Sequence, residues 1–201
     1  MIVIGYSGHA YVAIGILKAS GKKVIGYCDV EEKKYNPFNL SYLGQETSTG
    51  AIQAFEQTNF FIAIGDNAIR KNIYEQLKIQ NRFPINAIHP SAIIDTTATL
   101  ATAGIMIAAN ATINSLATIG EGAICNTGCI IEHECAIGNF SHIGPGAVLC
   151  GNVKISDGAF VGAGAVIRQG IHIGKNSMIG AGAVVVKDVA DNAKVVGVPA
   201  K

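Results

Sequence analysis

The C-terminal half of the chain places an aliphatic side chain at every sixth position. The series runs through Ile107, Ile113, Ile119, Cys125, Ile131, Ile137, Ile143, Leu149, Ile155, Val161, Ile167, Ile173, Ile179 and Val185, and Cys125 is its only exception. Four places after most of these residues stands a small one, as at Ala111, Ala117, Ala123, Cys129, Cys135, Ser141, Ala147, Ala159, Ala165 and Ala183. A helix would repeat every 3.6 residues and a lone strand every two, so this period belongs to neither.

A period of six is typical of a solenoid in which each hexapeptide forms one flat side and one tight corner. Three sides close a triangular coil, and stacked coils bury their aliphatic residues continuously. Ile94 and Leu100 extend the pattern upstream, with one extra residue before Ile107. The sequence therefore predicts an all-β, left-handed parallel β-helix over residues 86–190 and a C-terminal tail at 191–201.

Residues 1–85 follow a different pattern. A β-branched run in "MIVIGYSGHA" is followed by helical apolar spacing in "YVAIGILKASG", then by a second strand in "KKVIGYCD". "NFFIAIGD" and "NAIRKNIYEQLKIQN" repeat the strand-then-helix order. This alternation predicts a small parallel α/β sheet of Rossmann type, with 31–49 as a long loop.

Ligands of such sheets bind beyond the carboxyl ends of the strands, where a Gly-rich turn can approach phosphate closely. The residues at these ends are Ser7, Gly8 and His9, then Asp29, then Gly65 and Asp66. "GYSGH" is a truncated dinucleotide fingerprint, and a purely structural turn would also explain its glycines.

Composition narrows the class of protein. Charged residues make up 14% of the chain and the formal net charge is +1. We therefore expect no binding to nucleic acid, and without a long apolar run we expect no membrane insertion. The five cysteines form no CxxC pair, and "MIVIGYSGH" favours a first strand over a signal peptide. These features favour a cytoplasmic protein.

The repeat also predicts which polar side chains point outward. Cys125, Cys129 and Cys135 occupy inward positions, so we expect them to fill the core. His133 and His142 occupy outward positions, and glutamates flank His133 on both sides. A neighbouring carboxylate can fix a histidine tautomer and make its other nitrogen more basic. His133 is therefore a candidate general base, although an isolated outward histidine is often only a surface residue.

Histidines of stacked coils could instead bind zinc, as in three-histidine sites. Ligands on successive coils would be separated by multiples of three hexapeptides, and no pair among the five histidines has that spacing; these are His9, His89, His133, His142 and His172. We expect no metal.

The stretches "NTGCIIEHECAIGNFSHIGPGA", "FFIAIGDNAIRKNIY", "GYSGH" and "VVGVPAK" together resemble the NeuD/PglD family of bacterial sugar acyltransferases. The resemblance spans both halves of the chain. It implies that the N-terminal domain holds a nucleotide sugar, that the β-helix binds acetyl-CoA, and that the active site forms between subunits of a homotrimer serving glycan biosynthesis.

The resemblance also implies residue roles. His133 is the general base and Glu134 the carboxylate that raises its basicity, with Asn126 as a polar neighbour. The acetyl-CoA contacts implied are His142, Gly151, Ala163 and Ala181. The nucleotide-sugar contacts implied are Ser7, Gly8, His9, Asp29, Gly65 and Tyr74. Two departures bear on the sugar: only the first residue of the family's acidic pair after the second strand is present, as Asp29-Val30, and the loop at 31–49 is longer.

Three functions remain open at this point. The first is N-acetylation of a UDP-linked 4-amino-4,6-dideoxy sugar by direct attack of the amine on acetyl-CoA. The second is O-acetylation of a sialic acid or another sugar hydroxyl by the same base. The third is a non-catalytic trimeric scaffold or sugar-nucleotide sensor, which would not need the histidine–glutamate pair.

Overall fold

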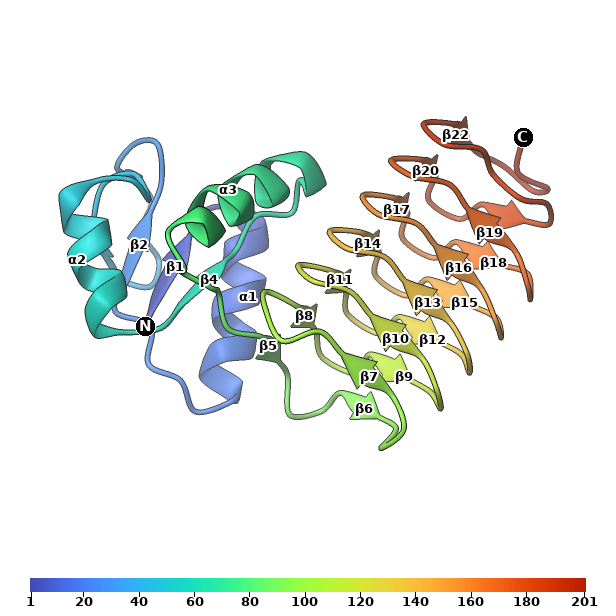
Figure 1. The fold of residues 1–201 in the computed structure, drawn as a ribbon, viewed down its shortest axis with the longest axis horizontal. Helices are drawn as coiled ribbons and strands as arrows, with labels where there is room; N and C mark the ends of the chain where they lie inside the picture. The colour runs from blue at the N-terminus through green and yellow to red at the C-terminus, as the bar shows by residue number, and fades with distance from the viewer.

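The computed structural model describes residues 1–201, which form an N-terminal α/β domain followed by a left-handed parallel β-helix (Figure 1). The N-terminal domain contains β1 (Ile2–Ile4), α1 (Gly8–Ala19), β2 (Gly26–Cys28), β3 (Ser41–Tyr42), α2 (Thr49–Gln57), β4 (Phe60–Ile62) and α3 (Asn67–Ile79). Its four strands are parallel in the order β3-β2-β1-β4. The predicted Rossmann-like alternation is thus confirmed for β1, α1, β2, β4 and α3.

Two elements were not predicted from the sequence. β3 is a two-residue strand at the edge of the sheet, inside the segment predicted to be a loop. α2 follows it, and the Ser48 hydroxyl caps this helix by accepting from the Ala51 N–H. A strand of two residues is too short to show an alternation of polar and apolar positions, which explains why the pattern did not reveal it.

The β-helix has three flat faces. The first face contains β5 (Ala87–Ile88), β8 (Met106–Ile107), β11 (Ile124–Cys125), β14 (His142–Ile143), β17 (Phe160–Val161), β20 (Met178–Ile179) and β22 (Lys194–Val195). The second face contains β6 (Ile93–Ile94), β9 (Thr112–Ile113), β12 (Ile130–Ile131), β15 (Val148–Leu149), β18 (Val166–Ile167) and β21 (Val184–Val185). The third face contains β7 (Thr99–Leu100), β10 (Thr118–Ile119), β13 (Ala136–Ile137), β16 (Lys154–Ile155) and β19 (His172–Ile173).

Three edges join these faces. The first edge joins the first and second faces, at 126–129, 144–147, 162–165 and 180–183. The second edge joins the second and third faces, at 114–117, 132–135, 150–153 and 168–171. The third edge returns to the first face, at 120–123, 138–141, 156–159 and 174–177. Because the coil is triangular, the second edge lies opposite the first face.

The core of the β-helix is the continuous stack of inward residues. Parallel pairing joins each strand to the one directly above it, as in Ile119 with Ile137 and Ile137 with Ile155. The repeated aliphatic positions from Ile107 to Val185 are all buried. Cys125, Cys129 and Cys135 are buried in the same stack, which confirms them as core residues.

The stack of coils continues past residue 190, where the sequence analysis placed the start of a tail. β22 pairs with β20 and adds a last strand to the first face. Between β21 and β22, the third face continues only as an isolated bridge between Ile173 and Val189, in place of a regular strand. The last coil has 16 residues instead of 18, because Ile173 pairs with Val189 and Met178 pairs with Lys194. This loss of two residues shifts the hexapeptide phase, which is why the periodicity alone ended too early.

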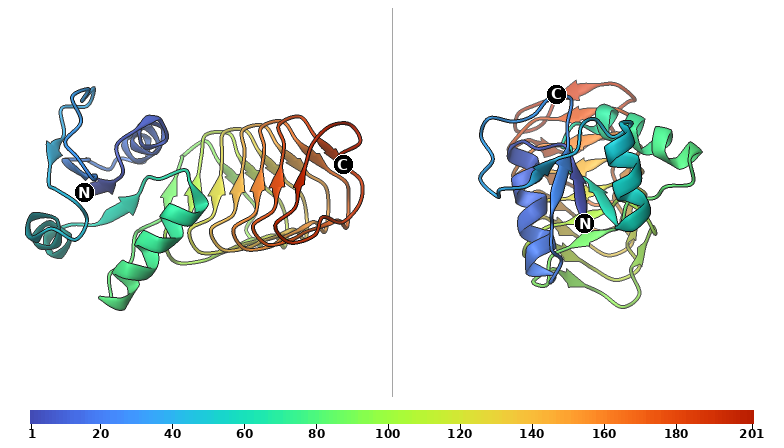
Figure 2. Two further views of the ribbon diagram at one scale, coloured as in Figure 1. Left: turned by 90° about the horizontal axis from the view of Figure 1, so that it is seen from above. Right: turned by 90° about the vertical axis from the view of Figure 1, so that its left-hand side faces the viewer.

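The N-terminal domain packs against the first face at the N-terminal coils. One shared apolar cluster joins α1 and the central strands to outward residues of the first face, including Met106 and Ile124. A second cluster joins α3 to Phe140 on the third edge. The C-terminal coils extend beyond this contact (Figure 2). None of the three helices combines the length and apolar character needed to cross a bilayer.

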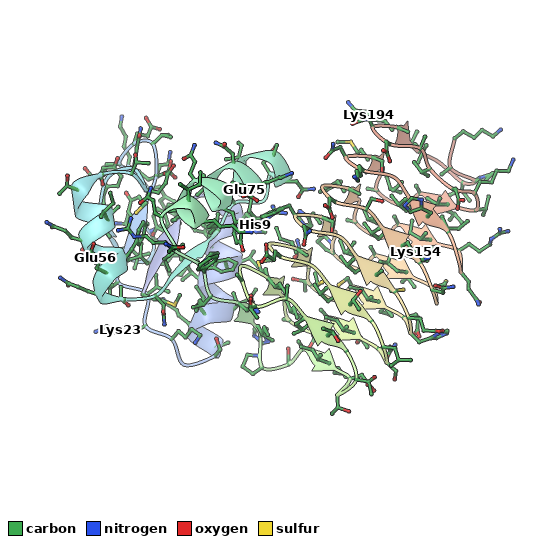
Figure 3. All side chains as sticks on the ribbon, in the orientation of Figure 1. His9, Lys23, Glu56, Glu75, Lys154 and Lys194 are labelled. Atoms are coloured by element: carbon green, nitrogen blue, oxygen red, sulfur yellow. The ribbon has the colours of Figure 1, made fainter.

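The alternation along each strand predicts unequal effects of two neighbouring substitutions. Ile155 points into the core and is buried, whereas Lys154 points outward from the third face (Figure 3). Ile155→Ala should lower the free energy of unfolding by about 2–5 kcal/mol, because it leaves a cavity in a packed stack. Lys154→Ala should change it by less than about 0.5 kcal/mol. Urea unfolding measures both, and similar losses would contradict the inward phase.

Candidate functional site

His133 lies on the second edge and points away from the core. Its Nδ1 atom is 3.0 Å from Glu134 Oε2, and the two side chains are 52% and 58% exposed. Since a carboxylate only accepts, Nδ1 carries the proton of a neutral imidazole in this pair and Nε2 is left as the free, basic nitrogen. The predicted outward orientation of His133 is therefore confirmed by its exposure.

Glu134 holds its position with an uncommon backbone conformation. Its φ angle is +60°, in the left-handed region. The equivalent corner of the other coils also has a positive φ. Leu116 and Phe140 occupy two of these corners, and the others hold Gly or Asn, as at Asn110, Gly122, Gly128, Gly146, Asn152, Gly158, Gly164, Gly170, Asn176 and Gly182. For a residue such as Glu this conformation costs roughly 1–2 kcal/mol.

Gly151 is the residue stacked one coil above His133, on the same edge. A Cβ atom added to Gly151 would lie 2.5 Å from both Cε1 and Nε2 of His133. The imidazole therefore rests on a backbone that has no side chain. The φ angle of Gly151 is not positive, so the close approach of His133, and not backbone strain, accounts for glycine here.

The other outward histidine, His142, lies on the first face. Its side chain is only 7% exposed, because the N-terminal domain covers it. Its Nδ1 atom is 3.4 Å from the Gly65 carbonyl oxygen and its Nε2 atom is 3.1 Å from Asn126 Nδ2. The Phe160 ring contacts it edge-on, with the centroids 5.1 Å apart.

The partners of His142 define its tautomer. A carbonyl oxygen can only accept, so Nδ1 donates to Gly65 and Nε2 accepts from Asn126. The Asn126 Oδ1 atom accepts from the Thr127 N–H at 2.8 Å, which fixes the orientation of the amide. Burial, with smaller contributions from Arg70 and His9, lowers the pKa of His142 from 6.5 to about 4. His142 is therefore neutral at physiological pH.

His9 completes this group from the N-terminal domain. Its ring centroid lies 6.0 Å from that of His142, and Figure 3 shows His9 on the side of the domain that faces the β-helix. Burial and, to a smaller extent, Arg70 lower the pKa of His9 to about 4. The His9 Nε2 atom is buried without a hydrogen-bond partner. A Cβ atom added to Gly65 would lie 3.3 Å from Cγ of His9, so glycine lets this turn pack closely against the ring.

Three further predicted contacts, Ser7, Gly8 and Asp29, lie at the carboxyl end of the sheet. Ser7 precedes α1 without a side-chain capping hydrogen bond, and Ser7 and Gly8 are exposed. Asp29 instead accepts from the Tyr6 N–H at 2.9 Å and forms an ion pair with Lys33 at 3.3 Å. Asp29 thus ties the ends of β1 and β2 together, while the start of α1 stays open.

The structure separates some residues that the resemblance grouped. Tyr74 is 1% exposed and packs edge-on against Phe140, so it does not reach a ligand surface; burial raises the pKa of its hydroxyl. Gly151 lies on the second edge, whereas Ala163 and Ala181 lie on the first. Within one chain, therefore, these three do not line a common groove, because the second face separates the two edges.

A cleft of about 1000 Å³ begins beside His142 and Gly65. It lies between α3 and the C-terminal coils of the first face, and its lining includes Asn67, Lys71, Phe160, Met178 and Lys194. Figure 3 shows Glu75 and Lys194 on its two sides. A cleft of this size is typical of a small-molecule site. No group of three or more His, Cys, Asp or Glu side chains is arranged to hold a metal ion.

Two residues of this region, Phe160 and Arg70, were not predicted to belong to a site. Phe160 occupies an outward position of the repeat, where an aromatic residue is unusual in this chain. Arg70 lies on the buried side of α3 with Ile73, Tyr74 and Leu77. The helical spacing of these four positions was visible in the sequence and could have marked Arg70 as buried.

Comparison with known proteins agrees with both halves of the fold. The PglD N-terminal domain family matches residues 1–77, and the bacterial transferase hexapeptide family (six repeats) matches residues 152–187. PerB from Caulobacter crescentus, solved in complex with CoA and GDP-perosamine, is 34% identical. The match covers 100% of this chain and 95% of PerB, with a TM-score of 0.91.

A second solved relative is the acetyltransferase domain of PglB from Neisseria gonorrhoeae. It is 31% identical over 100% of this chain and 97% of that chain, with a TM-score of 0.91. The same domain has been solved in complex with acetyl coenzyme A. Identity of this extent over the whole chain shows the family: the protein belongs to the NeuD/PglD family of acetyl-CoA-dependent sugar acetyltransferases, built on hexapeptide repeats.

Proposed function

We propose that the protein N-acetylates the amino group of a UDP-linked 4-amino-4,6-dideoxy sugar, with acetyl-CoA as donor and His133 as general base. The observation that carries this proposal is the 3.0 Å contact between His133 Nδ1 and Glu134 Oε2 on the outer edge of the β-helix. Glu134 keeps this contact from a left-handed backbone position that most other coils give to Gly or Asn, although Leu116 and Phe140 also adopt it.

The acceptor reacts as the free amine, after its ammonium form has released one proton to solvent. A base is then required because the nitrogen becomes cationic as it forms the N–C bond and must lose a second proton. The amine nitrogen attacks the acetyl carbonyl carbon, and His133 Nε2 takes up the proton that nitrogen loses. The C–S bond of the thioester then breaks, and the proton passes from His133 to the departing CoA sulfur. His133 accepts the proton in one step and returns it in the next. The acetyl group passes directly from sulfur to nitrogen, so no covalent acyl-enzyme is needed. Glu134 stabilises the transient imidazolium through Nδ1–H.

Asn126 is the group best placed to stabilise the charge that develops on the acetyl oxygen. His142 Nδ1–H is engaged by Gly65, and its Nε2 acts as an acceptor. His142 therefore has no N–H left for a ligand, but Asn126 Nδ2 carries a second hydrogen. An oriented N–H donor of this kind favours the transition state over the planar thioester.

The nucleotide sugar would bind at the carboxyl end of the N-terminal sheet. The first N–H groups of α1 have no protein partners after Ser7, and such a helix start favours a phosphate group. The sugar would then extend toward Gly65 and His142, where the cleft begins. This path places the acceptor amine beside the first edge of the same chain.

A homotrimer would bring His133 to that position. Five of the six outward side chains of the second face are apolar and reached by solvent in the single chain, namely Ile93, Ile130, Val148, Val166 and Val184; the sixth is Thr112. The corresponding third-face positions are mostly polar and exposed, namely Thr99, Thr118, Lys154 and His172. We therefore assign the second face to subunit contacts around a three-fold axis.

This arrangement explains the separation of the predicted residues. When three chains turn their second faces toward one axis, the first edge of each lies beside the second edge of the next. Asn126, Ala163 and Ala181 of one chain would then face His133 and Gly151 of its neighbour. Acetyl-CoA would lie in the groove between them. Each active site would thus need two chains.

A GDP-linked amino sugar is the second candidate acceptor, because PerB is solved with GDP-perosamine. CoA thiol release, measured with UDP-linked and GDP-linked 4-amino sugars and then with sialic acids, distinguishes the candidates. Turnover with the UDP-linked amine supports the proposal. Turnover only with a GDP-linked amine would mean that the acceptor carries GDP instead of UDP. Turnover only with a sialic acid would mean that the reaction is O-acetylation instead of N-acetylation.

Replacing the base should abolish most of the activity. We expect His133→Ala to lower kcat by a factor on the order of 10²–10⁴, the usual contribution of a positioned base. His172→Ala is the matched control, because His172 is also an outward histidine but lies on the third face. Steady-state kinetics with both variants test the assignment. An unchanged kcat for His133→Ala would eliminate the base mechanism.

Shared sites predict complementation between two inactive variants. His133→Ala and His142→Asn should each be inactive alone, and co-expression should restore about a quarter of the wild-type rate, because only one pairing in four joins intact edges. The measurement is activity of the mixed, purified trimer. No recovery from a stable mixed trimer, or a monomer at micromolar concentration, would argue against sites made by two chains.

The contact between Gly151 and His133 makes a further prediction. Gly151→Ala should displace the His133 imidazole. Because a displaced base transfers the proton less efficiently, we expect kcat to fall at least tenfold. Gly15→Ala is the control, since an added Cβ there meets nothing within 4 Å. The same collision should lower the free energy of unfolding when Gly151→Ala is made in the wild type, but not when it is made in a His133→Ala background. Urea unfolding of the single and double variants measures both effects. Equal losses in both backgrounds would contradict the contact.

A further inference from the structure

Arg70 is a fully buried cation at the junction of the two domains. It is 1% exposed, and burial lowers its pKa to about 10. Its guanidinium donates to acceptors in both domains: the carbonyls of Ile64 at 3.0 Å and Gly65 at 3.1 Å, Asn67 Oδ1 at 2.8 Å, and the carbonyls of Gly122 at 2.8 Å, Phe140 at 3.0 Å and Ser141 at 3.4 Å.

All these acceptors are neutral. Arg70 takes part in no ion pair with a carboxylate. Buried charges are normally paired, and an apolar residue of similar size could fill the same space. The planar fork of the guanidinium, by contrast, can orient several carbonyl groups from different segments at once. The geometry therefore indicates a role in orientation and not only in packing.

The oriented carbonyls lead directly to His142. Gly65 O accepts from Arg70 Nη1 and from His142 Nδ1, and His142 Nε2 accepts from Asn126. A second interdomain contact lies beside this one: Asn67 Nδ2 donates to the Gly158 carbonyl at 3.0 Å. One hydrogen-bonded series thus connects α3, the Gly65 turn, the first face and the first edge.

We propose that Arg70 is a positioning residue that fixes the Gly65 turn against the β-helix and thereby holds His142 neutral, with its proton on Nδ1. The charged and titratable groups facing His142 are Arg70 and His9. The fixed positive charge of Arg70 disfavours a second proton on His142. The fixed Gly65 carbonyl selects Nδ1 as the protonated nitrogen, which leaves Nε2 to orient the Asn126 amide.

The tautomer can be measured directly on protein labelled with ¹⁵N in its histidine rings. In the wild type we expect His142 to show a protonated Nδ1 and no titration near pH 6.5. In Arg70→Met, which removes both charge and donors, we expect mixed tautomers and a pKa of His142 above its present value of about 4. In Arg70→Lys, which keeps the charge but not the fork, the tautomer should become mixed while the pKa stays low. The His142→Asn variant assigns the signal.

Lys78→Met is the matched control. Lys78 also lies on α3 and also bridges to the β-helix, through an exposed ion pair with Glu121 at 3.6 Å. It should leave the His142 ring signals unchanged. If Arg70→Met does not fold, Asn67→Ala removes one acceptor of Arg70 and the second interdomain contact while keeping the cation. Unchanged His142 signals in the folded Arg70 or Asn67 variants would overturn the proposal.

The effect on catalysis rests on the function proposed above, whereas the tautomer and titration of His142 do not. With the correct acceptor, Arg70→Met should lower kcat at least tenfold, with a smaller change in the KM for the nucleotide sugar. A purely structural role would lower thermal stability without changing the His142 ring signals. Absence of wild-type turnover would count against the proposed function alone, because the ring signals are measured without substrate.

Discussion

Each hexapeptide of the β-helix must turn one aliphatic and one small side chain into the coil, because only continuous stacking gives the short strands a buried core. This constraint acts on every coil above and below, since parallel pairing keeps equivalent positions in line. It leaves only the remaining positions free to carry chemistry. The location of His133 on an edge and of His142 on a face follows from this inward phase.

The same constraint divides the candidate site between two parts of the surface. The edge that carries His133 is opposite the face that carries His142, so the packed core lies between them within one chain. The N-terminal domain covers the first face and adds His9 and the Gly65 turn to His142. An apolar second face between the two edges provides the surface through which a neighbouring chain can complete the site. In the proposed trimer, binding of the acceptor and activation of its amine would be assigned to different chains.

Several residues of the site depart from what stability alone would favour. Glu134 adopts a left-handed conformation, His9 buries an unpartnered nitrogen, and Arg70 buries a charge among neutral acceptors. Elsewhere most of the equivalent corners hold Gly or Asn, with Leu116 and Phe140 as exceptions, and the interior holds apolar residues. These costs are concentrated around the two histidines, where fixed orientation and a fixed protonation state are useful to a proton-transfer reaction.

The sequence by itself determined the β-helix, the inward cysteines, the outward direction of His133 and most of the α/β domain, because these depend on short periods that repeat along the chain. It did not reveal β3 or α2, which are too short or too weakly patterned, nor the last coil, whose phase is shifted because it is two residues shorter than the others. Only the tertiary structure buried Tyr74, separated Gly151 from Ala163 and Ala181, and placed Arg70 between the domains. Those outcomes depend on contacts between segments far apart in the chain, and no local period records how a domain docks on a face.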